Sequence, residues 1–444
     1  MFETIRPFLQ AENDCALAAA LPGQLGKTLW IQAVVYKIRH MSGFSFVLLQ
    51  FPDALVQAIA APAFSCFPME QLREFQCVRA EVFVAPETRS RLGYELQLHR
   101  IQLLSSPFQE PSLPVNNKSV KASLDTQLNE RALVLRNEAQ RAIFRLQTAL
   151  QQGMEEYLQN QGFTQIHTPK LVSGGAEGGA NMFSLSYFGQ QAYLAQSPQL
   201  YKQILVGVFQ RVYEVGPVFR AEKHDTSRHL NEYCSFDLEM GFVQDETALM
   251  ALETAMLGHA FEYVGRRHAD ALALLGARLP KVEEIPALRF AEAKALLQRE
   301  CGFCSADDLD FEPEEERLLC QLVQDKTGSE LVFVTGYRRE KRPFYAMDDE
   351  KHPGETRSFD LLFRGLEITT GGLRIHEYPA QVEKMRSMGL NPADFEGYLL
   401  AHKAGLPPHG GMGIGLERLT ARLLELPNLR QACLFPRDCK RLRP

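Results

Sequence analysis

The hydrophobic pattern of the chain changes once, near residue 105, and this change divides the chain into two parts. Five short runs rich in Val, Ile, Leu and Phe lie between residues 28 and 104, separated by turn residues. This spacing predicts a small antiparallel sheet or barrel of about five strands. A polar, proline-containing segment, SSPFQEPSLPVNNKSV, follows and is typical of a linker. We therefore expect a first domain over residues 1–107, a hinge over 108–130 and a second domain over 131–444.

The second part mixes helical and strand patterns without a regular alternation of the two. Apolar positions at helical spacing over residues 128–160 predict one long amphipathic helix that ends at Gly162. Strand-like runs such as RVYEVGPVFRAE and SFDLLFRGLEITTG lie between further helices, expected near 245–265, 290–300, 379–388 and 394–404. Strands and helices outside a regular βαβ order favour an α+β domain, with an antiparallel sheet flanked by helices.

Composition and charge narrow the class of protein. The 444 residues carry 48 Lys and Arg against 54 Asp and Glu, a net charge of −6. This balance argues against a protein that binds nucleic acid chiefly through bulk positive charge, although a local patch could still serve. The sequence has no run of about 18 apolar residues that could span a membrane. The start MFETIRPFLQ lacks the basic and then apolar pattern of a secretory signal. We expect a soluble cytoplasmic protein that uses no membrane.

Charged residues of both signs gather in VFRAEKHDTSRHLNEYCSFDLEM, residues 218–240. Arg220 and Glu222 alternate on a predicted strand, so both are expected on one face. The polar loop that follows carries Arg228 and His229, and a returning strand brings Tyr233. Such a hairpin can present guanidinium groups to phosphates and an aromatic ring to a base. The alternative is a solvated hairpin with surface ion pairs.

Two later segments carry residues suited to phosphate and metal. PPHGGMGIGLERL, residues 407–419, predicts a glycine-rich loop before a helix, where backbone N–H groups could cradle phosphate beside Arg418. In DLLFRGLEITTGGLRIH, Glu367 and Thr370 could share a divalent cation bound to phosphates, and Arg374 could pair with a carboxylate. Each segment could equally be structural, with its arginine in solvent.

A helix expected after Ser197-Pro198 places Gln199 and Lys202 side by side, one turn apart. Glu177 lies among four glycines in a loop that should be mobile. Taken singly, each of these residues is more often on a surface than in a site. The sequence offers no Ser/His/Asp set, no Cys/His nucleophile and no pair of catalytic carboxylates.

Taken together, these segments resemble a known family. FRAE, a loop, RHLNEY and the late GMGIGLERL resemble the second and third signature motifs of the class II aminoacyl-tRNA synthetases. GFTQIHTPKL resembles the first motif, which forms much of the dimer interface in that class. EGGANMF, LAQSPQLYKQ and LFPRDCKRLRP resemble the aspartyl-tRNA synthetases of the archaeal and eukaryotic type. The resemblance is continuous from about residue 124 to the end, and it implies a class II catalytic domain, ATP, Mg²⁺ and a homodimer.

The resemblance also implies roles for individual residues in ATP binding. Arg220 would hold the α-phosphate and the aminoacyl carboxylate, Tyr233 would stack on adenine, and Arg418 would cover the other adenine face and the γ-phosphate. Arg220, Glu222 and Arg418 are the expected catalytic residues. The remaining residues implied for adenine and the outer phosphates are Glu222, Arg228, His229 and Leu230. Glu367 and Thr370 match the Mg²⁺ positions near the acidic Asp360, although the family commonly has Ser in place of Thr370.

The implied amino acid is L-aspartate. Two fixed cations, Lys202 and Arg374, would face its side-chain carboxylate and favour the acid over the neutral amide. Asparaginyl-tRNA synthetases generally lack a lysine at the Lys202 position. The resemblance implies three further contacts to the amino acid, from Glu177 to its α-ammonium and from Gln199 and Arg220.

The first domain resembles, more loosely, the OB-fold that reads anticodons in this family. Phe46 would stack on an anticodon base, and Gln57 and Glu95 would read base edges. The chain departs from the family where the Gly-Trp-Val that usually opens the barrel reads IQAVV, and where an Arg-Asp reads Gln50-Phe51. These departures bear on tRNA affinity and identity more than on adenylation.

The expected activity is formation of aspartyl-adenylate from ATP and aspartate, then transfer to the terminal ribose of tRNA-Asp. Three alternatives stay open. The chain could activate asparagine, or also charge tRNA-Asn with aspartate. It could be a tRNA-independent ligase that passes the adenylate to a small amine, although such paralogues generally lack an anticodon domain. It could be a non-catalytic RNA-binding or regulatory paralogue, although such a protein would be free to lose Arg220, Glu222, Glu367 and Arg418.

Overall fold

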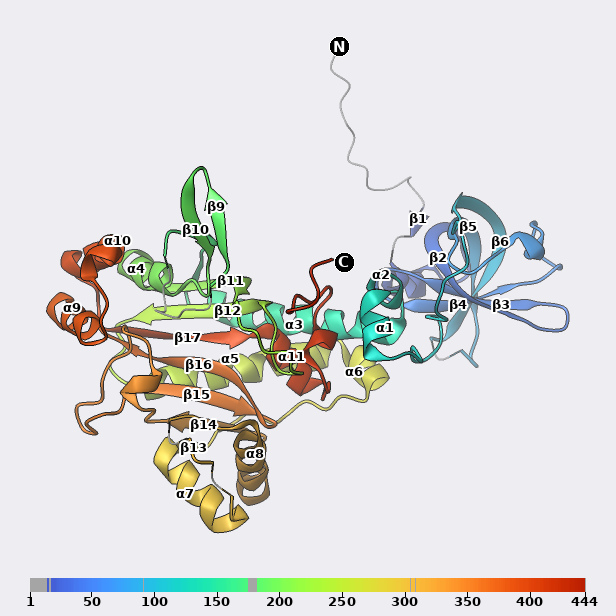
Figure 1. Ribbon diagram of the computed structural model, residues 1–444. Coiled ribbons are helices and arrows are strands. Elements are labelled where there is room, and N and C mark those ends of the chain that lie inside the picture. The colour runs from blue at the N-terminus through green and yellow to red at the C-terminus, as the bar shows by residue number, and fades with distance from the viewer. Residues whose placement is uncertain are drawn as a thin grey trace. The chain divides into compact units, whose positions relative to one another are not determined.

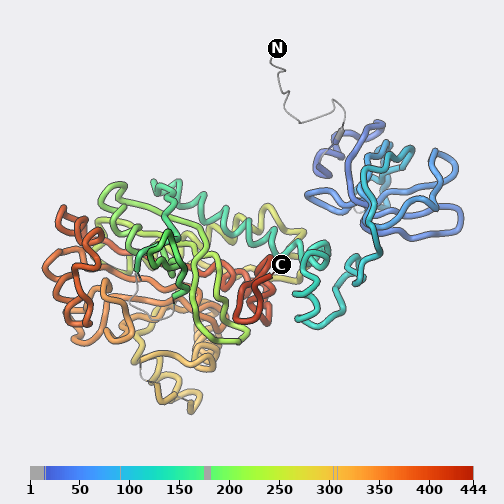
Figure 2. The backbone as a smooth tube through the Cα atoms, turned by 45° about the horizontal axis from the view of Figure 1, so that its top comes forward, coloured from blue at the N-terminus to red at the C-terminus, as the bar shows by residue number. Residues whose placement is uncertain are grey.

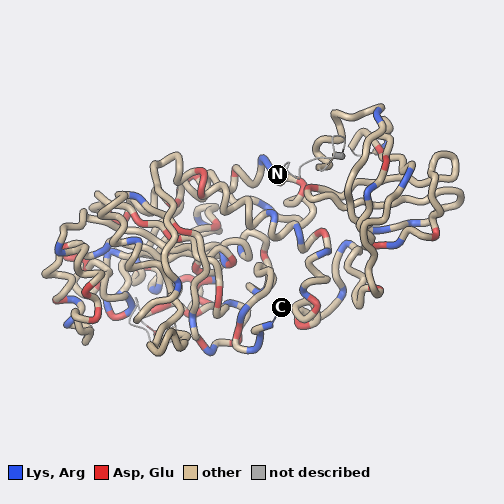
Figure 3. Tube along the Cα trace, turned by 90° about the horizontal axis from the view of Figure 1, so that it is seen from above, with Lys and Arg blue, Asp and Glu red and all other residues tan. Residues whose placement is uncertain are grey.

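The computed structural model describes residues 14–15, 17–90, 92–174, 182–303, 305–307 and 309–443. The chain divides into two compact units, Met1–Lys121 and Ala122–Pro444 (Figure 1). Each unit has a hydrophobic core of its own. Basic and acidic residues are interspersed along both units (Figure 3), as the near balance of charge predicts. In the part of the chain that the structure describes, no helix is long and apolar enough to cross a membrane.

The first unit is a closed five-stranded barrel, which confirms the expected fold. Its strands follow the order β2-β3-β4-β6-β5, and β5 pairs back with β2 to close the barrel. Buried and partly exposed residues alternate along β3, so Val47 and Leu49 point into the core. The β4–β6 pair is parallel, a departure from the antiparallel sheet or barrel that the sequence predicted. The strands are β1 (Asp14–Cys15), β2 (Thr28–His40), β3 (Ser45–Gln50), β4 (Leu55–Ala60), β5 (Cys77–Pro86) and β6 (Tyr94–Ser105), with 3₁₀ turns η1 (Ala18–Gln24) and η2 (Met69–Gln71).

The second unit is built on an eight-stranded sheet of order β13-β14-β15-β16-β17-β12-β11-β7. All neighbours are antiparallel except β7–β11 and β13–β14, so the expected antiparallel α+β architecture is confirmed with parallel pairs at both edges. These strands are β7 (Thr164–Gln165), β11 (Arg211–Phe219), β12 (Glu232–Gly241), β13 (Ala287–Arg289), β14 (Leu331–Thr335), β15 (Ser358–Phe363), β16 (Leu366–Arg374) and β17 (His409–Gly415). A small separate sheet contains β8 (Leu171–Val172), β9 (Ser184–Tyr187) and β10 (Gln190–Leu194).

One face of the large sheet packs on helices, and the middle of the opposite face is polar. Phe236 and Leu238 of β12 belong to the core shared with α3 and α5. Because side chains alternate along a strand, Ser235, Asp237 and Glu239 point to the opposite face. The helices are α1 (Leu124–Asn129), α2 (Arg131–Val134), α3 (Glu138–Asn160), α4 (Gln199–Phe209), α5 (Glu246–Arg267), α6 (Ala269–Leu275), α7 (Phe290–Cys301), α8 (Pro313–Thr327), α9 (Tyr378–Ser387), α10 (Glu396–Ala404) and α11 (Leu416–Leu423), with 3₁₀ turns η3 (Arg339–Lys341), η4 (Pro392–Phe395) and η5 (Leu429–Ala432).

The prediction of one long helix over residues 128–160 was wrong at its start. The long helix α3 begins at Glu138, because the Asn137 side chain caps it by accepting from the N–H groups of Ala139 and Gln140. The preceding residues form the short helices α1 and α2. Buried Arg131 of α2 donates to the backbone carbonyls of Gln431, Cys433 and Leu434, so the C-terminal segment runs back to these helices (Figure 2).

The predicted glycine-rich phosphate loop was also wrong, because Gly410, Gly411, Gly413 and Gly415 lie in strand β17 in the middle of the sheet. A Cβ atom on Gly411 would lie 2.1 Å from the carbonyl oxygen of Leu238 on β12. The glycines therefore allow close packing of neighbouring strands instead of a flexible loop.

Candidate active site

A cavity of about 410 Å³ opens on the polar face of the large sheet. Its walls come from α4, β12, β16, β17, the starts of α11 and η5, and the loops that precede α4, β12 and β15. The described residues that the sequence assigned to ATP, amino acid and Mg²⁺ all line this cavity: Gln199, Lys202, Arg220, Glu222, Arg228, His229, Leu230, Tyr233, Glu367, Thr370, Arg374 and Arg418. Glu177 lies outside the described residues.

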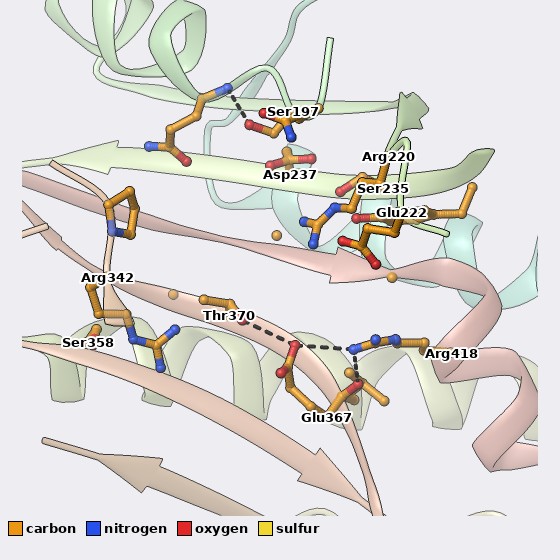
Figure 4. A pocket seen from close by; sticks show the side chains of 18 of the residues that line it. Ser197, Arg220, Glu222, Ser235, Asp237, Arg342, Ser358, Glu367, Thr370 and Arg418 are labelled. Atoms are coloured by element: carbon orange, nitrogen blue, oxygen red, sulfur yellow. Dashed lines mark hydrogen bonds and ion pairs between the residues drawn. The ribbon is translucent and has the colours of Figure 1, made fainter. Parts of the chain in front are cut away.

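Arg220 and Glu222 lie just beyond the end of β11, in the loop before β12, and not on the strand as predicted. The side-chain amide of Asn231 holds this stretch, donating to the backbone oxygens of Arg220 at 2.7 Å and Glu222 at 2.8 Å. The Arg220 guanidinium lies 5.7 Å from the ring centre of Tyr233. Arg220 and Glu222 face Glu367 and Arg418 across the cavity (Figure 4).

A β-bulge in β16 brings Glu367 and Thr370 to the same face. Leu361 pairs with Thr369 but Leu362 pairs with Glu367, so one extra residue, Ile368, is inserted. Without the bulge, residues three apart would point to opposite faces. The Thr370 hydroxyl donates to Glu367 Oε1 at 3.3 Å, and Arg418 donates to the Glu367 backbone oxygen at 2.9 Å and to Oε1 at 3.2 Å.

These groups fit a divalent cation held together with phosphates. Glu367 presents a carboxylate and Thr370 a hydroxyl, both hard oxygen donors on one face of one strand, which suits Mg²⁺ when a nucleotide and water supply the other ligands. The adjacent strand adds Asp360, whose Oδ2 accepts from Arg342 at 2.8 Å while its buried Oδ1 has no hydrogen-bond partner among the described residues. Burial raises the pKa of Asp360 to about 6, against the opposing charge of Arg342.

The loop 223–230 supplies a further cation and an imidazole. Arg228 pairs with Glu316 of α8. Burial raises the pKa of Glu316 to about 7, although the charge of Arg228 opposes this shift. Burial and then the positive charge of Arg418 lower the pKa of His229. His229 is therefore neutral at pH 7 and can donate or accept a hydrogen bond without adding charge.

Two cations and Asp237 line the other end of the cavity, and Glu239 lies buried behind them. Lys202 Nζ lies 2.9 Å from Asp237 Oδ1 and 3.5 Å from Glu239 Oε2, and Arg374 Nε donates to Glu239 Oε1 at 3.0 Å. The side chains of Lys202, Asp237, Glu239 and Arg374 are at most 7% exposed. Burial disfavours the charged guanidinium, but the charge of Glu239, the nearby Tyr345 and the hydrogen bond to Glu239 together outweigh burial and raise the pKa of Arg374. Charges that are buried and paired in this way stay fixed in position.

The residues assigned to the anticodon lie on the outer face of the barrel in the first unit. Phe46 is half-buried on β3 and meets Phe44 edge-on, with ring centres 5.0 Å apart. Pairing of Ala58 with Leu96 places Gln57 of β4 beside Glu95 of β6. Burial, followed by the charge of Glu87, raises the pKa of Glu95. A polar pair beside an outward-facing ring is an arrangement suited to an unpaired base.

Residues 123–439 match the model of a family described as tRNA synthetases class II (D, K and N). The chain belongs to this family. It is 45% identical to the aspartate–tRNA(Asp/Asn) ligase of Thermus thermophilus over 96% of this chain and 99% of that protein. It is 38% identical to the aspartate–tRNA(Asp) ligase of Thermococcus kodakarensis over 94% of this chain and 97% of that protein. The predicted resemblance to aspartyl-tRNA synthetases is thereby confirmed, and this synthetase is a ligase of an ATP-using class.

Solved structures agree with the fold of this synthetase. Asparaginyl-tRNA synthetase from Pyrococcus horikoshii, complexed with asparaginyl-adenylate, superposes with a TM-score of 0.89 at 27% identity and covers 98% of this chain and 100% of that chain. Aspartyl-tRNA synthetase from Entamoeba histolytica superposes with a TM-score of 0.84 at 28% identity and covers 100% of this chain and 96% of that chain.

Sequence reasoning gave no role to several residues that shape the cavity of this synthetase. Asp237 and Glu239 partner the two cations, and their alternation with Phe236 and Leu238 was the signal that both face the site. Arg342 reaches Asp360 from a loop for which the sequence held no signal. Glu417 accepts the N–H of Cys234, next to Tyr233, and burial raises the pKa of Glu417 to about 7.

Proposed function

We propose that this synthetase activates L-aspartate with ATP to aspartyl-adenylate and transfers the aspartyl group to the 3′ end of tRNA-Asp. The observation that carries this proposal is the pair of buried cations, Lys202 and Arg374, at one end of the cavity. A side-chain carboxylate entering between them meets two positive charges, whereas a neutral amide gains no comparable attraction.

The two buried carboxylates define the rest of the amino-acid pocket. Asp237 uses Oδ1 for Lys202, and its buried Oδ2 has no hydrogen-bond partner among the described residues. An α-ammonium group that reached this oxygen would satisfy it. Glu239 lies between Lys202 and Arg374 and keeps both oriented. Gln199, Arg220 and Glu177 complete the proposed aspartate contacts.

Adenylation needs charge neutralisation and alignment more than a general base. One oxygen of the aspartate α-carboxylate forms a bond to the α-phosphorus of ATP, the bond from that phosphorus to the bridging oxygen breaks, and the electron pair leaves with pyrophosphate. Arg220 beside Tyr233 would neutralise the α-phosphate, and Arg418 with Arg228 and His229 would hold the outer phosphates. Preorganised cations of this kind lower the barrier without moving during the reaction.

Glu367 and Thr370 are the proposed holders of Mg²⁺, with Asp360 behind them. When bound, the ion would neutralise phosphate charge beside Arg418. The chain's own part is to present the carboxylate and hydroxyl on one face through the β16 bulge.

The remaining assignments follow from family membership and from the two units. Residues 1–107 are proposed as the anticodon-binding domain, with Phe46, Gln57 and Glu95 on its outer face, residues 108–130 as the hinge, and residues 131–444 as the catalytic domain. The partners are tRNA and a second copy of this chain, and the compartment is the cytoplasm, where tRNA is charged for translation. The dimer assignment is supported by the first motif, GFTQIHTPKL, which β7 carries to the edge of the large sheet.

A second candidate function, aspartylation of tRNA-Asn as well as tRNA-Asp, is favoured by the relatives. The proteins from Thermus thermophilus and Deinococcus radiodurans, 45% and 41% identical, are aspartate–tRNA(Asp/Asn) ligases. The altered barrel residues, including Gln50 and Phe51, lie in the unit that would discriminate between the two anticodons.

The test is charging of purified tRNA-Asp and tRNA-Asn with labelled aspartate at one salt concentration, alongside aspartate-dependent ATP–pyrophosphate exchange. Charging of tRNA-Asp alone supports a strict enzyme, and charging of both supports the second candidate. Exchange without charging of either tRNA would contradict the transfer step and favour a ligase that uses a small amine. A chain without aspartate-dependent exchange would contradict the proposal itself and leave a non-catalytic role.

A further inference from the structure

The loop 223–230 carries three of the proposed ATP contacts, Arg228, His229 and Leu230, but has little structure of its own. Arg228 and His229 line the cavity, whereas residues 223–228 belong to no helix or strand. A loop of this kind would sample many conformations unless other parts of the protein held it. The contacts that hold this loop in place should therefore affect nucleotide binding.

The segment 428–441, near the end of the chain, makes the contacts that hold this loop. The backbone N–H of Leu429 donates to the Ser227 carbonyl oxygen at 2.9 Å, and the N–H of Asn231 donates to the Arg437 carbonyl oxygen at 2.9 Å. The middle of the loop and the residue that follows it are thus tied to one distant segment. These bonds use main-chain atoms, so they do not by themselves single out a side chain.

Two charged side chains join the two segments, the exposed Lys440, which pairs with Asp225 Oδ2, and the buried Arg430. Arg430 Nη1 donates to the Thr226 carbonyl oxygen at 3.0 Å, its Nη2 pairs with Asp225 Oδ1 at 2.8 Å, and its Nε pairs with Asp438 Oδ2 at 2.5 Å. The Arg430 side chain is 10% exposed and that of Asp438 is 4% exposed. Three separate nitrogens of one planar guanidinium thus reach three acceptors that lie around it, a spread that the single nitrogen of a lysine cannot span.

Thr226 links Arg430 to Arg228 and His229, which line the cavity. Its carbonyl oxygen accepts from Arg430, while its hydroxyl lies 2.6 Å from His229 Nδ1 and accepts from the N–H of Arg228 at 3.1 Å. A change at Arg430 therefore reaches Arg228 and His229 through one intervening residue.

We propose that Arg430 is a positioning residue for ATP, which holds the loop 223–230 in the conformation that aims Arg228 and His229 into the cavity. This inference rests on the proposed ATP site. Arg430 itself does not line the cavity in the part of the chain that the structure describes, so its effect is exerted through Thr226 and Asp225. Removing it should weaken ATP binding while leaving aspartate binding and the chemical step largely intact.

The experiment compares Arg430→Met and Arg430→Lys with the control Arg441→Met in the full chain. Arg441 belongs to the same segment, but its guanidinium pairs with Asp125 and Asn129 of α1, away from the loop. We expect Arg430→Met to raise the KM for ATP in aspartate-dependent exchange about tenfold, with kcat and the KM for aspartate within about threefold of wild type. Arg430→Lys should show a smaller increase, and the control none.

A double-mutant cycle with Asp225→Asn tests the route of the effect. If Arg430 acts through the loop, the two substitutions should be non-additive in the KM for ATP. An unchanged KM for ATP in Arg430→Met would overturn the inference. So would a parallel loss of kcat, aspartate affinity and melting temperature, because that pattern indicates a merely structural role.

Equilibrium binding of ATP without aspartate separates this inference from the proposed function. A wild-type chain that binds ATP but shows no aspartate-dependent exchange contradicts the proposed function. In that case the positioning role of Arg430 is still tested by comparing the ATP dissociation constants of the Arg430 variants with that of wild type. Equal ATP dissociation constants for wild type and Arg430→Met would overturn the inference whatever the exchange assay gives.

Discussion

Lys202 and Asp237 lie 2.9 Å apart, Nζ to Oδ1, in a cavity wall where each side chain is at most 4% exposed. They come from different elements, α4 and β12, and both face the space where the proposed aspartate would bind. A buried pair of this kind holds a cation ready for a substrate carboxylate at no cost of reorientation during binding.

Replacement of Lys202 should selectively lower kcat/KM for aspartate. Lys202→Met leaves Asp237 without its partner and removes one of two charges that favour a carboxylate, so we expect kcat/KM for aspartate to fall by about 100-fold or more. The assay is aspartate-dependent ATP–pyrophosphate exchange. Lys170→Met is the matched control, since Lys170 pairs with Glu214 at 2.9 Å and does not line the cavity. Normal kcat/KM in Lys202→Met would contradict the assignment of the amino-acid pocket.

Substitution of Glu367, which the β16 bulge places beside Thr370, should change the Mg²⁺ dependence of the enzyme. Glu367→Gln removes the carboxylate charge next to Thr370 and Arg418, so the Mg²⁺ concentration for half-maximal exchange should rise about tenfold. Titration of exchange activity with MgCl₂ measures this change. Glu330→Gln serves as the control, because Glu330 pairs with Arg364 away from the cavity. An unaltered Mg²⁺ requirement in Glu367→Gln would show that the ion is held elsewhere.

The stability difference between Glu253→Gln and wild type should depend on pH. Burial beneath the sheet, with the charge of Asp360 adding and the hydrogen bond from Thr369 opposing, raises the pKa of Glu253 to about 8 from its ordinary value of 4.5. Between these values the folded protein keeps a proton that the unfolded chain releases, so stability is lost as pH rises. Glu253→Gln abolishes this titration, and its stability relative to wild type should rise with pH by up to about 1.4 kcal/mol per unit between pH 5 and 8.

Urea unfolding at several pH values and one protein concentration measures this difference. Glu262→Gln, an exposed position on the same helix, is the control and should show little pH-dependent change. A stability difference between Glu253→Gln and wild type that stays constant from pH 5 to 8 would show that Glu253 does not hold its proton in the folded state.

Phe46 should matter for tRNA but not for adenylation. Loss of a stacked base costs about 1–3 kcal/mol, so Phe46→Ala should raise the KM for tRNA-Asp about tenfold while leaving ATP–pyrophosphate exchange unchanged. Phe108→Ala, at a fully exposed phenylalanine outside the barrel strands, is the control. Equal KM values for tRNA-Asp in Phe46→Ala and wild type would contradict the assignment of the outer face of β3 to the anticodon site.

Much of the site could be predicted because its residues sit in short local patterns. The spacing of Gln199 and Lys202 already placed them on one helical turn, and the hairpin around residues 218–240 was visible from its charges and apolar flanks. The class of fold followed from the order of strand and helix patterns. These features depend on neighbours within a few residues, so the sequence alone determined them.

Tertiary structure decided the features that depend on distant partners. Nothing local indicates that Gly411 must pack against Leu238, so the glycines of β17 suggested a loop when they belong to a central strand. The inserted residue in β16 exists only through its register with β15, and that register turns Glu367 and Thr370 to one face. Arg430 likewise gains its role from Asp225 and Thr226, about 200 residues earlier in the chain. Short stretches of sequence thus specify which chemical groups are present and how each local element presents them. Strand register and packing bring those groups together, because both depend on segments far apart in the chain.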